Sequence, residues 1–418
     1  MFREKTIYEK VAFFSFMVFL FFSFFGTATP FRQQVTDVED ITSSNIINQV
    51  LYTYLFLAAL FALLPMYSIL GAFFRKEKFL SIFIIFVTLS LAWSDNTLVS
   101  VKRIVQLYAE LLICLAFIMH AKSDEEMLEY FKPILYIFIL ATITVCLTIP
   151  GAKDAQFNTW RGFTTQKNDL GELGLVCVLL TFFIYKREET FLSRLVAGTM
   201  VLLSVVIVVG TFSSTCLITL TLLIGIGSLW SIDKIFKPIG INRAVTSLVI
   251  FSIIGFILLV ILLAPDLLDL LPTVFGKDTT FSGRTDLWVY MMDELQRHLL
   301  LGVGYQGFWV VGSQRIVLLY KQFVWLPNQA HNGYIDVVNE LGLVGFGLFL
   351  LMIISYFVNL ARYKIHSIWK WFIIIALILN LQETTFLRPG KLINSLIIFS
   401  YIVLAVKMYR KDLEPATE

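Results

Sequence analysis

The chain has 418 residues, of which 58% are hydrophobic and only 15% are charged, and its mean hydropathy is +0.79. This balance lies far outside that of soluble domains, so a water-soluble core is excluded. A net charge of +3 gives no footprint for nucleic acid, and no nucleic-acid partner is expected. Four cysteines without C-x-x-C spacing lie in or beside apolar runs, which favours plain packing over metal or disulfide roles: Cys114, Cys146, Cys177 and Cys216.

Twelve apolar runs follow one another along the chain, most of them near the roughly 20 residues that a helix needs to cross a bilayer. The first run has a basic start but no small-x-small cleavage signature after it, so we expect a retained helix. The third is short, which weakens the count. The expected spans are 11–29, 46–73, 79–93, 100–120, 133–149, 169–185, 194–210, 214–231, 244–264, 333–359, 367–385 and 391–408.

Lysine and arginine are concentrated in alternate connections, and this bias predicts orientation in the membrane. If the N-terminus is cytoplasmic, every inner loop is basic. The sequence therefore predicts an all-α integral membrane protein with about twelve transmembrane helices and both termini in the cytoplasm. Residues 1–264 would form helices one to nine, residues 265–332 a long external loop, and residues 333–418 helices ten to twelve.

The fourth expected span carries ionisable groups on one face, with Lys102, Arg103, Gln106 and Glu110 at spacings of three and four. Ionisable groups in a membrane usually face a cavity or one another. The spacing leaves two interpretations open, a structural ion pair or the lining of a cavity.

Some cations are expected on the outer side, against the tendency of lysine and arginine to lie in cytoplasmic loops. They are the first residues that indicate a function. Arg161 and Lys167 lie in the segment W-R-G-F-T-T-Q-K-N-D-L-G, which ends where the sixth helix is expected to begin. Arginine offers a planar fork to phosphate oxygens, and a helix start adds a positive dipole end. The segment is a candidate diphosphate cradle, and a pair of cations facing lipid headgroups is the alternative.

The expected loop from about 265 to 330 is too long for a simple connection. Arg284 and Asp286 open a stretch in which apolar residues recur every three or four positions, which predicts an amphipathic helix: Trp288, Met291, Met292, Leu295 and Leu299. Such a helix could lie at the bilayer surface or roof a cavity. The G-x-G-x-x-G at 302–307 lacks the βαβ context of a dinucleotide site, but its amides could face an anion or a sugar.

The strongest polar signal leads into the tenth helix with the segment Q-A-H-N-G-Y, which contains His331, Asn332 and Tyr334. Asn332 is a candidate N-cap, which would place His331 at the outer mouth. Histidine can accept a proton from a hydroxyl near neutral pH, although it could also simply anchor the interface. Glu340 is expected to be a buried, hydrogen-bonded structural carboxylate.

Two further groups of residues belong to the last three helices. Gly342, Gly345 and Gly347 suggest close helix packing. Gln382, Glu383 and Arg388 lie at the outer end of the eleventh span. Of these three, we expect Arg388 to contact a ligand because it would lie at the mouth.

Four of these segments together resemble the O-antigen ligase and polysaccharide polymerase superfamily, membrane glycosyltransferases with a long outer loop followed by a histidine-led helix. They are R-G-x-x-x-x-K-N-x-x-G at 161–171, G-R-T-D-x-W at 283–288, L-G-V-G-x-x-x-F-W at 301–309 and H-N-G-Y-x-x-x-x-x-E-x-G-x-x-G at 331–345. The resemblance covers about 155–350. One departure is that the turn at 211–215 lacks the basic residue that the family often has, so Arg388 or Lys167 would have to replace it.

The resemblance implies transfer of a glycan from an undecaprenyl-diphosphate donor to a sugar or lipid-core acceptor, with inversion, without metal, cofactor or nucleotide sugar. It implies a bacterial cytoplasmic membrane protein with a GT-C-like plan, in which 265–332 is a catalytic loop and the site faces the periplasm or exterior. Membrane lipids and a possible chain-length regulator are the other implied partners. His331, Arg284 and Arg161 are the expected catalytic residues. The expected substrate-binding residues are Lys167, Arg388, Asn332, Tyr334, Asp286, Lys102 and Arg103.

The sequence leans toward a polysaccharide polymerase over a ligase that joins the glycan to lipid A core. A flippase or transporter of lipid-linked sugars is a third hypothesis. The chain shows no internal repeat and places its polar motifs on one side, both of which argue against alternating access.

Overall fold

The computed structural model describes residues 5–26, 45–154, 158–236, 284–323 and 327–413. Within these ranges the regular structure is helical, and the only β pairing is an isolated bridge between Lys153 and Trp160. The all-α prediction is therefore confirmed for the described residues. The expected ninth span, 244–264, lies outside them.

The helices follow the expected spans in order within the described ranges. The first part of the chain forms α1 (Ile7–Phe25), α3 (Ile46–Leu63), α4 (Tyr67–Lys76), α5 (Lys78–Leu89), α6 (Thr97–His120) and α7 (Asp124–Thr148). Then come α8 (Lys167–Arg187), α9 (Phe191–Gly210), α10 (Ser214–Phe236), α13 (Arg284–Arg297), α14 (Gln314–Gln322), α15 (Gly333–Arg362), α16 (Lys370–Leu379) and α17 (Leu392–Leu413).

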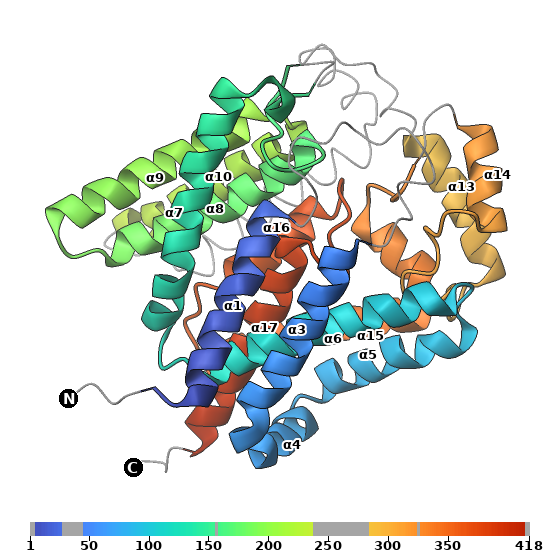
Figure 1. The fold of residues 1–418 in the computed structure, drawn as a ribbon, viewed down its shortest axis with the longest axis horizontal. Coiled ribbons are helices and arrows are strands. Elements are labelled where there is room, and N and C mark those ends of the chain that lie inside the picture. The colour runs from blue at the N-terminus through green and yellow to red at the C-terminus, as the bar shows by residue number, and fades with distance from the viewer. Residues whose placement is uncertain (1–4, 27–44, 155–157, 237–283, 324–326, 414–418) are drawn as a thin grey trace.

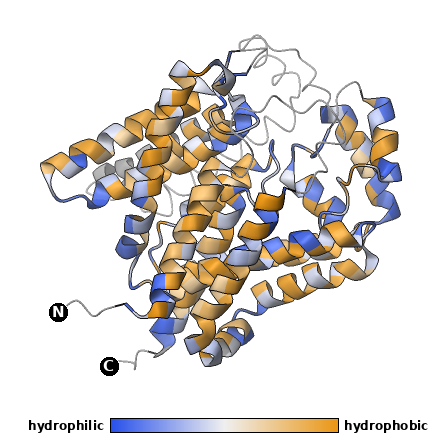
Figure 2. Cartoon of the chain, viewed as in Figure 1, coloured by the Kyte–Doolittle hydropathy of each residue, from blue (hydrophilic) through white to orange (hydrophobic). Residues whose placement is uncertain are grey.

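Seven of the described helices are long and apolar enough to cross a membrane, which makes the chain a multi-pass membrane protein. They are Ile7–Phe25, Ile46–Gly71, Asp124–Thr148, Lys167–Arg187, Phe191–Gly210, Gly333–Arg362 and Leu392–Asp412. Shorter apolar segments lie at three further expected spans, and Figure 2 shows the apolar residues that dominate these helices. The total of twelve spans and their orientation remain predictions.

Two expected helix boundaries were wrong for identifiable reasons. The second span is interrupted at Pro65, which lies in a 3-10 turn between α3 and α4, because proline has no backbone N–H to continue a helix. The fifth helix begins at Asp124 rather than at 133, since the side chain of Ser123 accepts the N–H of Glu126 as an N-cap. Pro133 then lies inside α7.

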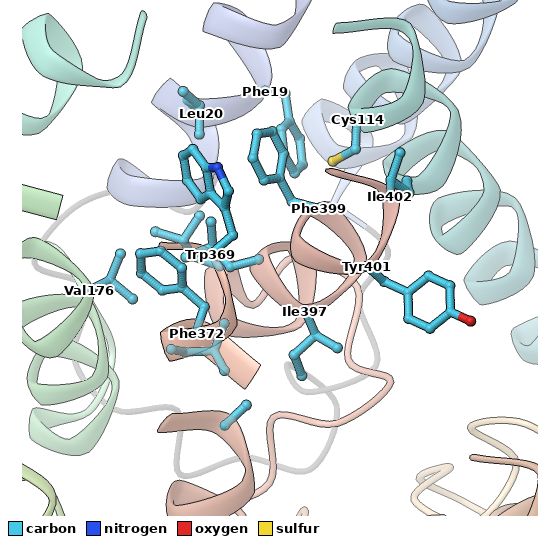
Figure 3. Close-up of a cluster of buried hydrophobic side chains, with 14 of the residues drawn as sticks. Phe19, Leu20, Cys114, Val176, Trp369, Phe372, Ile397, Phe399, Tyr401 and Ile402 are labelled. Atoms are coloured by element: carbon cyan, nitrogen blue, oxygen red, sulfur yellow. The ribbon is translucent and has the colours of Figure 1, made fainter. Parts of the chain in front are cut away.

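Helix α17 runs through the centre of the molecule, and 83% of its most apolar 18-residue stretch is buried. Its Phe399 packs against Trp369 with ring centroids 4.7 Å apart, and Phe131 of α7 contacts both rings. Figure 3 shows Trp369 and Phe399 with Phe19 and Phe372 beside them. All four cysteines are buried thiols, which confirms their expected packing role.

Helices α13 and α14 share a small second core with the turn at 303–308. Leu287, Met291 and Leu295 of α13 are buried, so the expected amphipathic helix is confirmed, whereas Met292 and Leu299 are exposed. Figure 1 places α13 and α14 on the side of the molecule opposite the two chain ends. The described part of the long loop, 284–323 and 327–332, therefore has its own apolar interior.

Helix α15 is broken at Gly342, whose φ of 66° and ψ of −175° are not helical. The segment before the G-x-G-x-x-G turn binds this break through its backbone. Leu343 and Val344 donate to the carbonyls of Leu299 and Leu300 at 2.9 and 3.1 Å, and Val303 donates to Asn339 at 3.1 Å. The break therefore does more than allow close packing, because its backbone groups find partners in the loop.

Candidate functional site

The start of α15 is fixed against the loop that follows α16. Asn332 caps the helix by accepting the N–H groups of Tyr334 and Ile335, as the sequence predicts. Gly333 donates to the carbonyls of Asn380 and Glu383 at 2.9 and 3.0 Å. A Cβ at position 333 would lie 1.9 Å from Oδ1 of Asn380, so only glycine allows this approach.

His331 lies directly before this cap with a φ of 50°, a left-handed backbone that non-glycine residues rarely adopt. Its Nδ1 is 3.4 Å from Oε2 of Glu383 and 3.3 Å from Nε2 of Gln329. The Glu383 side chain is only 3% exposed, and that of His331 is 15% exposed. The turn therefore holds the imidazole against a buried carboxylate.

Arg284 reaches the same carboxylate from the first turn of α13. Its Nη1 donates to the carbonyl of Gln382 at 2.9 Å, and its Nη2 lies 3.8 Å from Oε1 of Glu383. Burial lowers the pKa of the Arg284 guanidinium, and the Glu383 carboxylate opposes that shift. Arg284 and His331 thus face one carboxylate from two directions.

The first turns of α8 and α10 complete this region. Asn168 of α8 donates to Oε1 of Glu383 at 2.6 Å, and Thr215 of α10 donates to the side chain of Gln382 at 2.8 Å. We call His331, Glu383, Arg284 and Asn168 the histidine cluster. Its members come from four separate segments, and Lys167 is the immediate neighbour of Asn168 at the start of α8.

Arg161 is 6% exposed and binds the loop in which it lies. Its Nε donates to the carbonyl of Gly151 at 3.1 Å, and its Nη1 donates to that of Thr165 at 3.4 Å. These contacts favour a role in shaping the 150–166 loop over direct contact with a ligand. The catalytic role that the sequence suggested for Arg161 remains a prediction.

Arg388 is held by carboxylates of the protein, and its expected contact with a ligand remains a prediction. Its guanidinium lies 2.8 Å from Glu340 and 3.3 Å from Asp336, two buried carboxylates of α15. The opposing carboxylates raise the pKa of Arg388. Glu340 also accepts the backbone N–H of Gln306 at 3.1 Å, so it is the buried structural carboxylate that the sequence predicted.

The polar residue of the 382–388 loop that meets His331 is therefore Glu383 rather than Arg388. The position of Glu383 at the end of an apolar run indicated a partner, since a carboxylate in such a place normally has one. Lys391 was missed altogether. It forms an ion pair with Asp169 of α8 and lies 4.0 Å from Glu172, one helix turn from Asn168.

Lys102 and Arg103 line a cavity of about 470 Å³ between the starts of α3 and α6 and residues 309–311. Its wall also holds amide and aromatic side chains, among them Asn48, Gln106 and Trp309. Arg103 donates to Gln106 at 3.0 Å. Glu110 instead accepts hydrogen bonds from Tyr52 and from two side chains of α17, Asn394 and Ser395. Of the two open interpretations, cavity lining is the one that the structure supports.

The other expected ligand residues are not part of the histidine cluster. The Tyr334 hydroxyl donates to the carbonyl of Leu377 at 2.8 Å, so it points into the helix bundle. Asp286 is exposed in the first turn of α13. In the G-x-G-x-x-G turn, the N–H groups of Tyr305 and Gln306 bind Ser90 and Glu340, so the anion that this turn faces belongs to the protein itself.

Comparisons with known proteins agree with the family resemblance of the sequence. Residues 199–350 match a family model described as O-Antigen ligase. A stretch of 212 residues is 28% identical to the exopolysaccharide production protein ExoQ of Rhizobium meliloti (strain 1021). Both matches support the resemblance of this chain to the O-antigen ligase and polysaccharide polymerase superfamily.

The alignment with ExoQ covers 47% of this chain and 45% of that protein, so about half of either chain is compared. The O-antigen ligase match contains Arg284, Asp286 and His331, together with α10, α13, α14 and the first part of α15. Asn168 and Glu383 lie outside it. The histidine cluster is thus completed by parts of the fold that the family match does not reach.

Proposed function

We propose that the chain is a membrane glycosyltransferase that moves a glycan from undecaprenyl diphosphate to a sugar hydroxyl. The observation that carries this proposal is the histidine cluster, in which a histidine, a buried carboxylate and an arginine meet from distant segments. The proposal includes a location in the bacterial cytoplasmic membrane, with the cluster on the outer face.

In the proposed reaction, His331 is the general base. In the tautomer that we propose, Nδ1 carries the proton and donates to an ionised Glu383, which leaves Nε2 able to take a proton. The acceptor hydroxyl oxygen attacks the anomeric carbon while its proton passes to Nε2. Glu383 then faces the imidazolium and stabilises it, as a buried carboxylate does for other catalytic histidines.

Arg284 is proposed to hold the leaving group. The bond between the anomeric carbon and the diphosphate oxygen breaks with both electrons going to the diphosphate, which leaves as undecaprenyl diphosphate. A guanidinium already placed beside the site can neutralise this growing charge without reorganisation. Lys167, beside Asn168, is proposed as a second cation for the same group, and attack opposite the leaving group inverts the anomeric centre.

The cavity beside Lys102 and Arg103 is proposed to hold sugar residues of a substrate. Its mixture of amides, cations and Trp309 suits hydroxyl-rich rings, because amides bind hydroxyls and an aromatic face covers the apolar side of a sugar. Trp309 also links the cavity to the cluster, since its indole donates to Asp336 at 2.6 Å and Asp336 accepts the N–H of Ala330, next to His331.

Polymerase is the form of the activity that we favour, and ligase is the alternative. The similarity to a protein named for exopolysaccharide production favours polymerisation, whereas the family description names a ligase. A ligase would use the same donor site with a lipid A core or another acceptor.

The test uses purified full-length protein and lipid-linked repeat units. Chain growth without another acceptor supports a polymerase, and product only after core lipid is added supports the ligase. His331→Ala is expected to slow transfer by about 10²- to 10⁴-fold, the usual loss for a general base, and Glu383→Gln is expected to slow it less. Near-normal turnover in His331→Ala, with normal folding and insertion, would remove this residue from the mechanism.

A further inference from the structure

A second cationic cavity lies at the opposite ends of the helices, away from the histidine cluster. It has a volume of about 310 Å³ and opens where α6 ends, α7 begins and α17 ends. Both chain ends emerge on this side of the molecule (Figure 1). Its floor is apolar and buried, and consists of Ile118, Ala121, Met127, Val403 and Val406.

The charged residues among those described at the rim of this cavity are all basic, namely Lys122, Lys407, Arg410 and Lys411. Lys122, Arg410 and Lys411 are exposed, and Lys407 is half-buried. No carboxylate belongs to the lining. Such a rim repels cations and attracts an anion.

The protein neutralises part of this charge. Lys407 binds Asp124 at 2.7 Å, and Lys122 interacts electrostatically with Glu126. Arg410 and Lys411 instead donate to neutral backbone carbonyls, at Ala121 and Tyr363 among others. The charges of these last two cations have no carboxylate among the described residues that line the cavity.

Orientation in the membrane explains part of this pattern, because cations collect at cytoplasmic helix ends. The tendency of cations to lie at cytoplasmic helix ends explains exposed positive charge. It does not explain why these cations surround a cavity with an apolar floor. A ligand that combines a phosphate with an apolar part would satisfy both surfaces. The first turn of α7 also presents its N–H groups near this cavity, since Ser123 and Met127 line it.

We propose that this cavity binds the phosphate headgroup of an anionic membrane lipid of the phosphatidylglycerol class. The phosphate contacts the basic rim, and the glycerol and first acyl carbons cover the apolar floor. Basic pockets between transmembrane helices on the cytoplasmic side are suited to such headgroups. The lipid would tie together the ends of α6, α7 and α17, and its binding does not depend on the proposed transferase activity.

The experiment measures binding of short-chain phosphatidylglycerol to the purified full chain in a neutral detergent, by native mass spectrometry and titration. The variant Lys122→Gln/Lys411→Gln removes two exposed rim cations without touching the Lys407–Asp124 pair. We expect one saturable site that this double variant weakens by about thirty-fold, from the usual contribution of a basic residue near an anionic headgroup.

The matched control is Lys10→Gln/Lys78→Gln, which removes two exposed cations of α1 and α5 that do not line the cavity. This control is expected to bind as the wild type does. Equal loss in both double variants, or equal binding of phosphatidylcholine, would overturn the proposal. Glycerol phosphate and inorganic phosphate form a further arm, and tight binding of either would assign the cavity to a soluble phosphate compound instead.

Discussion

Two arginines of the outer region show how the surroundings decide what one side chain does. Arg388 lies between Glu340 and Asp336, so its charge is matched within the protein. Arg284 shares a single carboxylate with His331 and otherwise binds a backbone carbonyl. The first arginine is therefore expected to stabilise the fold, and the second to remain available to a ligand.

Arg388→Gln is expected to lower the melting temperature in detergent. Removing one partner of a buried ion pair costs on the order of 3 kcal/mol, because the remaining carboxylates stay buried without a counter-ion. Arg284→Gln is the matched comparison, and we expect near-normal melting with a large loss of glycan transfer. Lost transfer with unchanged melting in Arg388→Gln would instead assign this residue to the substrate, as the sequence first suggested.

Residues whose setting is local were the ones that the sequence predicted well. Asn332 was identified as a cap because capping depends on the next three residues. Glu340 was expected to be buried because it lies in an apolar helix. The contact between His331 and Glu383 spans 52 positions and depends on the turn after α16, which no periodicity in the sequence indicates.

Among the helices, α15 depends most on a single residue. Gly342 combines a positive φ with an extended ψ, a region open essentially to glycine. A Cβ there would lie 2.2 Å from the carbonyl oxygen of Leu300, which is backbone and has little freedom to move. The loop segment and the helix break are therefore a matched pair.

Gly342→Ala is expected to destabilise the docking of residues 299–303 by at least about 2 kcal/mol, from backbone strain and overlap together. Gly347→Ala is the control, because nothing lies within 4 Å of a Cβ at that position. Hydrogen exchange of the 298–307 backbone measures the effect. Protection in Gly342→Ala equal to that in Gly347→Ala would mean that this docking does not depend on the glycine.

The helices also show where pattern reading falls short. Apolar runs located α1, α8 and α9 well, since length and composition define a membrane span. The same rule predicted one span for α3 and α4 together, because it counts apolar residues and takes no account of Pro65. For α16, the expected 367–385 shortened to Lys370–Leu379, because the residues from Asn380 onward form the loop that meets α15.

At the scale of the whole molecule, the proposed reaction requires the histidine cluster and the two termini to lie on opposite faces of the membrane. The arrangement in Figure 1 agrees with this, since the chain ends lie together and α13 lies far from them. Loop charges predicted the same orientation from the sequence. The contacts among distant segments that build the outer site could not be predicted in this way.

Single-cysteine labelling in intact spheroplasts tests the orientation. The four native cysteines are buried and should react poorly, so they give a low background. Arg297→Cys, at a side chain that is 71% exposed, should react with a membrane-impermeant maleimide from outside. Lys10→Cys, on the exposed face of α1, should react only after permeabilisation. The reverse pattern would place the cluster in the cytoplasm and end the proposed function.

The break at Gly342 has an evolutionary consequence. Because the loop takes over the backbone bonding at this point, the short piece of α15 that carries the cap and Glu340 is anchored separately from the long piece below it. Exposed positions of the long piece, such as Leu351, Ile354 and Val358, can then be substituted by other apolar residues with little effect on catalysis. Homologues should therefore tolerate most variation in the lower two-thirds of this helix, and indels should be rare between 299 and 342.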